Sequence, residues 1–171
     1  MKRFRCYNGP MATTAAQAKV TTGTSIKTML QIATPSDEQM LLISWGYTID
    51  VPPATTSTGV VELLQADVAA TVTAHVAAGV QNLDPNGNPS NMTLGTTATG
   101  YTSSNEGTVA ATRMFDVVEV PGLTAGGTAN PPYVYQWMPD ERPIVAVSKF
   151  LRVRVTFAAA VNMVCWVCWD E

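Results

Sequence analysis

Charged residues are scarce in this chain of 171 residues. Asp, Glu, Lys and Arg make up only 13% of it, and no Lys or Arg occurs between Lys27 and Arg113. Because every bound phosphate needs a cation beside it, this distribution argues against nucleic-acid binding by the body of the protein. The surface must be built largely from Thr, Ser, Asn, Gly and Ala. Such a surface favours a protein that packs against other proteins, because a freely soluble monomer normally carries more charge.

Long apolar runs are missing as well. No stretch approaches the roughly 18 consecutive apolar residues of a membrane-spanning helix. The first residues, MKRFRCYNGPM, are basic but are not followed by the apolar segment of a secretory signal. We therefore expect no membrane contact, and we expect the protein to be localised by assembly into a particle. Translation from Met1 and from Met11 both remain open.

The chain has few of the residues that active sites use. His75 is the only histidine, and no serine or cysteine lies in the context of a nucleophile motif. The acidic pairs at residues 37–38, 140–141 and 170–171 are adjacent, and neighbours in extended chain point apart. The sequence therefore predicts that the protein is not an enzyme and has no cofactor.

No set of residues has the pattern of a metal site. Cys165 and Cys168 have the spacing of a zinc or redox motif, but residues three apart on a strand lie on opposite faces. A calcium loop at Asp84, Asn86 and Asn88 would lack the bidentate Glu that completes such a loop. We expect the cysteines to act as small buried apolar residues.

Two strands are predicted at the C-terminal end, joined by a short Ala-rich connection. In the first, apolar residues at 151, 153, 155 and 157 alternate with Arg152 and Arg154, which is typical of a half-buried strand. The second is apolar on both faces: Val161, Met163, Cys165, Val167 and Trp169 on one, and Val164, Trp166 and Cys168 on the other.

Both faces of this last strand need cover. One face can be covered by the opposite sheet of the same domain. Leaving the three residues of the other face in water would forfeit about 5–9 kcal/mol of burial. We therefore predict an oligomer interface that includes Val164, Trp166 and Cys168, together with Arg152 and Arg154.

The rest of the chain predicts a single all-β domain. Further strands are expected at residues 25–32, 40–50, 60–65, 108–120 and 133–138, with a short strand within 67–80 and loops at 83–107 and 121–132. No helix is expected. About eight antiparallel strands with long crossing loops favour a jelly-roll-like β-sandwich over residues 25–171.

Residues 1–24 predict an extended N-terminal arm, because they are small and polar and lack a clear apolar period. The arm is basic, and we expect it to contact an acidic partner through Lys2, Arg3, Arg5 and Lys19. A frayed charged terminus is the alternative. On this interpretation, deleting residues 1–20 leaves a folded oligomer that has lost its partner.

One aromatic cluster is a candidate recognition surface. Tyr133, Tyr135 and Trp137 alternate along one predicted strand. Aromatic residues in this arrangement stack on sugars or anchor protein interfaces, and packing in the core is the alternative.

The order of these features resembles small tailed-phage particle proteins with a jelly-roll-like fold. The segments that carry the resemblance are LISWGY at 42–47, VVELL at 60–64, LDP at 83–85, ERP at 141–143, FLRVRV at 150–155 and the ending at 161–171. Together they extend over residues 25–171. The shared positions are core and turn positions, so the resemblance transfers no functional residues.

The resemblance implies a capsid decoration, or cement, protein. Such a protein is made in the host cytoplasm, forms a homotrimer, binds the major capsid protein and stabilises the outer surface of a phage head. The expected partners are therefore other copies of the chain and the major capsid protein, which the arm at residues 1–24 and the loops at one end of the sandwich are expected to contact. The alternative is a trimeric receptor- or glycan-binding module of a virion spike or fibre.

Overall fold

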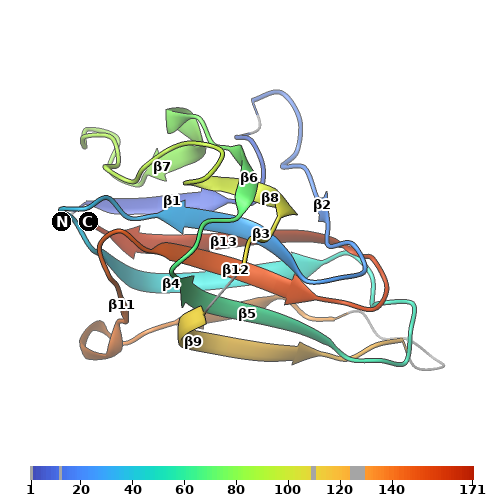
Figure 1. The fold of residues 1–171 in the computed structure, drawn as a ribbon. Coiled ribbons are helices and arrows are strands. Elements are labelled where there is room, and N and C mark those ends of the chain that lie inside the picture. Colours follow the sequence, from blue (N-terminus) through green and yellow to red (C-terminus); the bar gives the residue numbers. More distant parts are fainter. Residues whose placement is uncertain (1, 12, 109–110, 124–129) are drawn as a thin grey trace.

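The computed structural model of the chain describes all residues except 1, 12, 109–110 and 124–129. The described residues form two antiparallel sheets packed face to face as a β-sandwich (Figure 1). The predicted all-β sandwich is thereby confirmed. Figure 1 also shows the two ends of the chain side by side, in agreement with the pairing of Arg3 with Asp170.

Sheet A has seven strands, with β10, β4, β13, β1 and β7 in that order. The short strands β11 and β2 pair with β4 and β13 respectively. The bounds are β1 Arg3–Tyr7, β2 Val20–Thr21, β4 Met40–Ile49, β7 Val80–Asn82, β10 Tyr133–Gln136, β11 Ile144–Val145 and β13 Asn162–Asp170.

Sheet B has six strands in the order β6, β8, β3, β12, β5 and β9. Their bounds are β3 Lys27–Ala33, β5 Gly59–Ala66, β6 Thr71–Ala74, β8 Gly100–Asn105, β9 Ala111–Val120 and β12 Phe150–Thr156. The helices among the described residues are two single turns, η1 Ala77–Gly79 and η2 Pro139–Glu141.

The two C-terminal strands lie in opposite sheets. β12 is central in sheet B and β13 is central in sheet A, so the Ala-rich connection crosses from one sheet to the other. This crossing is consistent with the expected jelly roll, in which sequential strands alternate between sheets. It also lets the apolar residues of both strands face one shared core.

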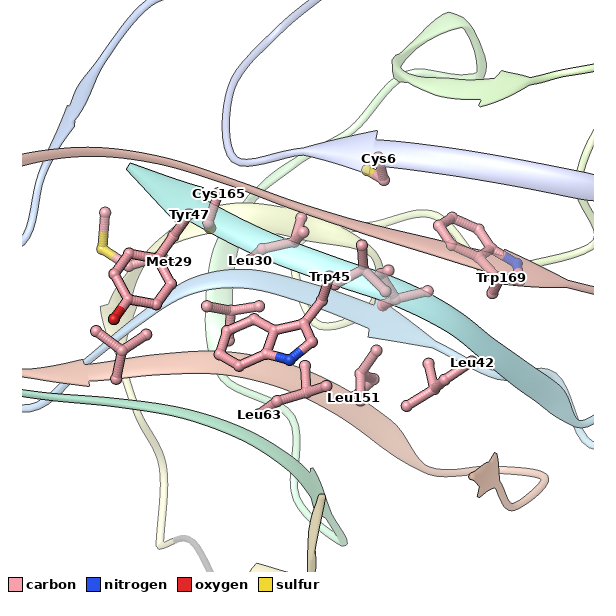
Figure 2. Packing of buried hydrophobic residues seen from close by; sticks show 14 of the residues in the cluster. Cys6, Met29, Leu30, Leu42, Trp45, Tyr47, Leu63, Leu151, Cys165 and Trp169 are labelled. Carbon is pink, nitrogen blue, oxygen red and sulfur yellow. The ribbon is translucent and has the colours of Figure 1, made fainter. Parts of the chain in front are cut away.

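The core lies between the sheets and is built from the alternating apolar residues of their strands (Figure 2). Sheet A contributes Phe4, Trp45, Cys165 and Trp169, all fully buried. Sheet B contributes aliphatic side chains, among them Leu30, Leu63, Leu151 and Val153. A period of two places these residues on one face of each strand, as the sequence predicted for β12 and for the inner face of β13.

The expectation of an extended arm over residues 1–24 is wrong for β1. Arg3–Tyr7 pairs with β13 on one side and with β7 on the other. Phe4 and Cys6 are fully buried in the core. The physical reason is that Phe4 and Cys6 alternate with Arg3 and Arg5, a short period-two pattern that suits a strand with one buried face. Residues 20–21 also pair with β13, as β2.

Several short strands were also not predicted. β8 lies within a segment expected to be a loop, and thirteen strands are described where about eight were expected. β7 and β8 consist of polar residues and glycine, apart from Val80 and Tyr101. Their place in the sheets comes from pairing with β1 and β3, which their own composition does not indicate.

Candidate functional site

The outer face of sheet A is the first candidate site, because β13 is apolar on both sides. Residues opposite one another in the paired strands share a face, which places Val134, Gly46, Trp166 and Tyr7 in one row across the sheet. We name the outward-facing residues around this row the Trp166 face: Tyr7, Thr48, Val134, Ile144, Val164 and Trp166.

Trp166 is held by Gly46 in its own row and by Arg5 in the next row. A Cβ atom added to Gly46 would lie 3.0 Å from Cζ2 of Trp166 and 2.6 Å from the carbonyl oxygen of Tyr133. The indole therefore occupies the space above the glycine. On the other side, the Arg5 guanidinium carbon lies 4.9 Å from the centre of the indole, a cation–π contact.

Cys168 is covered by the same chain and is not available to a partner. It pairs with Ser44 and Arg5 in the row next to Trp166 and is only 4% exposed. Burial raises the pKa of its thiol, and hydrogen bonds with Arg5 and Ser44 act in the opposite direction. Cys165 faces the core and is also buried, so the two cysteines lie on opposite faces as predicted.

The remainder of the Trp166 face is open. Val134 is 61% exposed and Ile144 is 39% exposed, and both lie on strands that pair directly with β4. Val164 and Trp166 are half-buried. At one end of the face, Asp170 is neutralised by Arg3 and Arg142 at 3.6 and 3.1 Å. The result is an aromatic and aliphatic surface whose charged groups, Arg3, Arg142 and Asp170, lie at one end.

Arg152 and Arg154 do not join this face. They lie on β12, in the other sheet, and Arg152 is completely buried. Its guanidinium donates hydrogen bonds to the carbonyl oxygen and carboxylate of Glu106, both at 3.3 Å, and to the carbonyl oxygen of Val68. Arg154 bonds Glu62 at 2.8 Å. Within one chain these arginines hold sheet B and its loops together, and the prediction that they share a surface with Trp166 is wrong.

The three aromatic residues predicted to form a recognition surface, Tyr133, Tyr135 and Trp137, differ in how far they are buried. Trp137 is 7% exposed, and Tyr135 packs edge-on against it with ring centres 5.2 Å apart. Tyr133 faces the core side of β10, where it stacks on Tyr47 and meets the edge of Trp45, each at 5.4 Å. Only Tyr135, 40% exposed, keeps much of its ring in solvent.

The cations of the expected arm are likewise dispersed. Arg3 and Arg5 project from the outer side of β1, where they contact Asp170 and Trp166. Lys19 forms an ion pair with Asp50 at 3.3 Å. Lys2 precedes β1, and its carbonyl oxygen accepts a hydrogen bond from Glu171. These side chains do not form one basic patch.

A second site lies where the two sheets meet at an edge, and sequence reasoning did not identify it. Asp116 on β9 reaches from sheet B to sheet A, where its Oδ2 accepts hydrogen bonds from Trp45 Nε1 at 3.0 Å and from the Tyr133 hydroxyl at 2.6 Å. Its Oδ1 accepts the backbone N–H of Val117 at 2.9 Å. One carboxylate thus fixes the positions of two aromatic rings.

Beside this carboxylate is a cavity of about 300 Å³, lined by Tyr47 and by residues 118–121 and 130–133. Burial and the charge of Asp116 raise the pKa of Tyr47 to about 12. Burial and the hydrogen bond to Asp116 also raise the pKa of Tyr133. Both phenols therefore stay protonated at neutral pH. The sequence signal for the site was weak, because Tyr47 is far along the chain from the other lining residues, 118–121 and 130–133.

His75 has a structural environment. Its Nε2 lies 2.8 Å from the carbonyl oxygen of Tyr7, and its ring packs on Tyr101 with centres 4.8 Å apart. Burial lowers the pKa of His75. In the described part of the chain, no three His, Cys, Asp or Glu side chains gather where they would hold a metal ion. The same part contains no helix long and apolar enough to cross a membrane.

Comparison with known proteins gives no relative: no protein-family model, no curated protein and no solved structure matches the chain.

Proposed function

We propose that this chain is a structural protein of a virus particle, a decoration protein that forms a homotrimer and binds the outer surface of a phage head. The observation that carries the proposal is the Trp166 face. It presents aromatic and aliphatic side chains on the open side of a sheet, in a protein whose surface otherwise has few charges. Exposed apolar patches of this kind are typical of contacts between proteins.

The composition of the face suits a subunit interface. Interface centres are enriched in Trp, Tyr and other apolar residues and depleted of carboxylates and lysines. Trp166 is held in one orientation by Gly46 and Arg5, so its burial by a neighbour costs little conformational entropy. In a closed trimer, the Trp166 face contacts a different surface of the next copy.

Binding to the head follows from the resemblance and from charge. A net charge of −3 suits the outside of a shell better than the side that faces DNA. Because β1 is part of the sandwich, it is not a free arm that could contact the major capsid protein. We assign this contact to the connection between β1 and β2, which includes Lys19. Binding only to assembled capsid protein stabilises the assembled state by mass action.

Native mass spectrometry tests the trimer. We expect wild-type protein to appear as three copies and the Trp166→Lys variant as single copies, because a lysine placed in the interface brings an unpaired charge. Val76→Lys is the matched control, since Val76 is 68% exposed and lies outside the Trp166 face. A monomeric wild type, or a Trp166→Lys variant that remains trimeric, contradicts the proposed interface.

Electron microscopy of the particle that carries this protein tests the location. The proposal expects density for the sandwich on the outside of the head. Density inside the head or at the tip of a tail fibre contradicts the decoration role and leaves the oligomer measurement unaffected.

A further inference from the structure

We propose that the edge cavity is a binding site for a single pyranose ring of a neutral carbohydrate. The cavity lies between the end of β9 in sheet B and the paired strands β4 and β10 in sheet A. It is distinct from the Trp166 face, and this inference does not depend on the proposed decoration function.

Ring surfaces form much of the cavity. Tyr47 and Tyr133 line it from sheet A, and Pro131 and Pro132 line it from the segment that leads into β10. A pyranose presents a face of C–H groups that packs flat against such rings, while its hydroxyls point outward around its rim. A volume of about 300 Å³ is at the lower end for ligand sites, which suits one ring of a carbohydrate.

The site is built before any ligand arrives. Tyr133 is fixed by its hydroxyl bond to Asp116 and by stacking on Tyr47, and Asp116 is itself fixed by Trp45. A wall with locked side chains loses little entropy on binding, which favours recognition of a small ligand.

Both donors and acceptors line the cavity. The side-chain nitrogen of Asn130 is shielded from solvent and has no hydrogen-bond partner within the part of the chain that the structure describes. An orphaned amide of this kind is costly, and the cost is removed if the Asn130 side chain turns toward a ligand acceptor in the cavity. Glu119 adds an exposed carboxylate that accepts hydrogen bonds. A sugar hydroxyl both donates and accepts, so one ligand type satisfies both residues.

The same groups argue against other ligand classes. No Lys, Arg or His is among the described residues that line the cavity, so phosphates, sulfates and acidic sugars find no cation there. A hydrocarbon leaves the Asn130 amide unpaired. An all-proline segment fits the rings and has carbonyl acceptors for Asn130, but its backbone has no N–H donor for the carboxylate of Glu119.

The experiment is a titration of the full-length protein with methyl glycosides of glucose, galactose, mannose and N-acetylglucosamine, followed by NMR. We expect at least one glycoside to bind and to shift the signals of Tyr47, Tyr133 and Asn130. Saturation-transfer spectra should show the ring protons of that glycoside against aromatic side chains. Tetraproline is titrated in parallel as the competing ligand class.

Two variants locate the binding. Asn130→Ala should weaken the affinity roughly two- to tenfold, the value of one neutral hydrogen bond. Pro131→Trp should abolish binding by filling the cavity, and Pro131 is exposed, so the fold should tolerate the change. The matched control is Asn86→Ala, a residue in the exposed turn after β7, which should bind like the wild type.

Three results would overturn the inference. One is that none of the glycosides shifts the cavity signals of the wild type. Another is that Asn130→Ala and Pro131→Trp bind as well as the Asn86→Ala control. The third is that tetraproline binds in the cavity and the glycosides do not. A trimeric protein that gives any of these results retains its proposed assembly role.

Discussion

The outer faces of the two sheets differ in how far the rest of the chain covers them. On sheet B, the polar side chains of Gln31 and Arg152 are completely buried, because residues 68–70 and 106 are laid over them. On sheet A, Trp166 and Val164 are half-buried although they are apolar. The burial of an outward-facing side chain in this protein therefore depends more on whether a loop covers its sheet than on whether the side chain is polar.

The hydrogen bonds show how the cover on sheet B is held. Gln31 exchanges two bonds with the backbone of Ala70, at 2.8 and 3.3 Å. Arg152 binds the carbonyl oxygens of Val68 and Glu106 and the Glu106 carboxylate. On the outer side of sheet A, the described residues include one comparable anchor, the buried Asp170, which Arg3 and Arg142 contact at one end of the Trp166 face. The rest of the face is left uncovered by the single chain, and in the proposed trimer a neighbouring copy covers it.

The largest expected effect concerns the strand that completes sheet A. Deleting residues 1–10 removes β1 and exposes the edge of β13, and we expect the remaining chain not to fold. The point substitution Phe4→Ala should lower the free energy of unfolding by about 3–5 kcal/mol, because it leaves a cavity in the core. Chemical denaturation measures this loss, with Lys2→Ala as the unaffected control. A folded, fully stable deletion variant would restore the arm interpretation.

The next effect is on the cover of sheet B. Glu106→Ala leaves the Arg152 charge buried without its carboxylate, and we expect a loss of about 3–5 kcal/mol. Asp67→Ala breaks an ion pair with Lys149 in which the two side chains are 41% and 34% exposed, and it should cost less than about 1 kcal/mol. Urea titrations of both variants give the comparison. Equal losses in the two variants would mean that the buried arginine does not anchor the cover.

A smaller effect is expected from pH. The folded protein lowers the pKa of His75 below its ordinary value, mainly by burial, so the unfolded chain takes up a proton more readily. The contribution of His75 to stability is therefore full above about pH 6.5 and is lost as the pH falls through its folded pKa. Thermal unfolding between about pH 7 and pH 5 measures this loss. The variant His75→Gln should lack it; an identical pH profile in wild type and variant would exclude His75 as the cause.

The smallest effect on stability is expected on the Trp166 face. Val134→Ser should change the free energy of unfolding of the single chain by no more than about 0.5 kcal/mol, because Val134 is mostly exposed. The same substitution should weaken the trimer, which sedimentation velocity at several concentrations would detect. A variant with wild-type association would remove Val134 from the interface.

Much of the fold could be predicted because side-chain alternation is local. The pattern in residues 161–169 specifies both faces of β13, and the faces of Cys165 and Cys168 follow from it. The signal for β1 was present in the alternation of Phe4 and Cys6 with Arg3 and Arg5. However, three of the first five residues of the chain are basic, which is also typical of a solvated terminus. Pairing with β13 decides between these interpretations.

The sites could not be predicted in the same way because they depend on distant segments. The burial of Arg152 requires Val68 and Glu106, which reach it from two separate loops. The edge cavity requires the end of β9 in sheet B to meet Tyr47 and Asn130 on the side of sheet A. Residue type in a single strand contains no information about such partners.

Hydroxyl-radical footprinting of the wild-type protein over a range of concentrations tests whether the Trp166 face is buried between copies of the chain. The account predicts that oxidation of Trp166 falls as concentration rises and trimers form, while oxidation of Met114, which is 48% exposed on β9, stays constant. Equal oxidation of Trp166 at all concentrations, with the protein remaining a single chain, would contradict it.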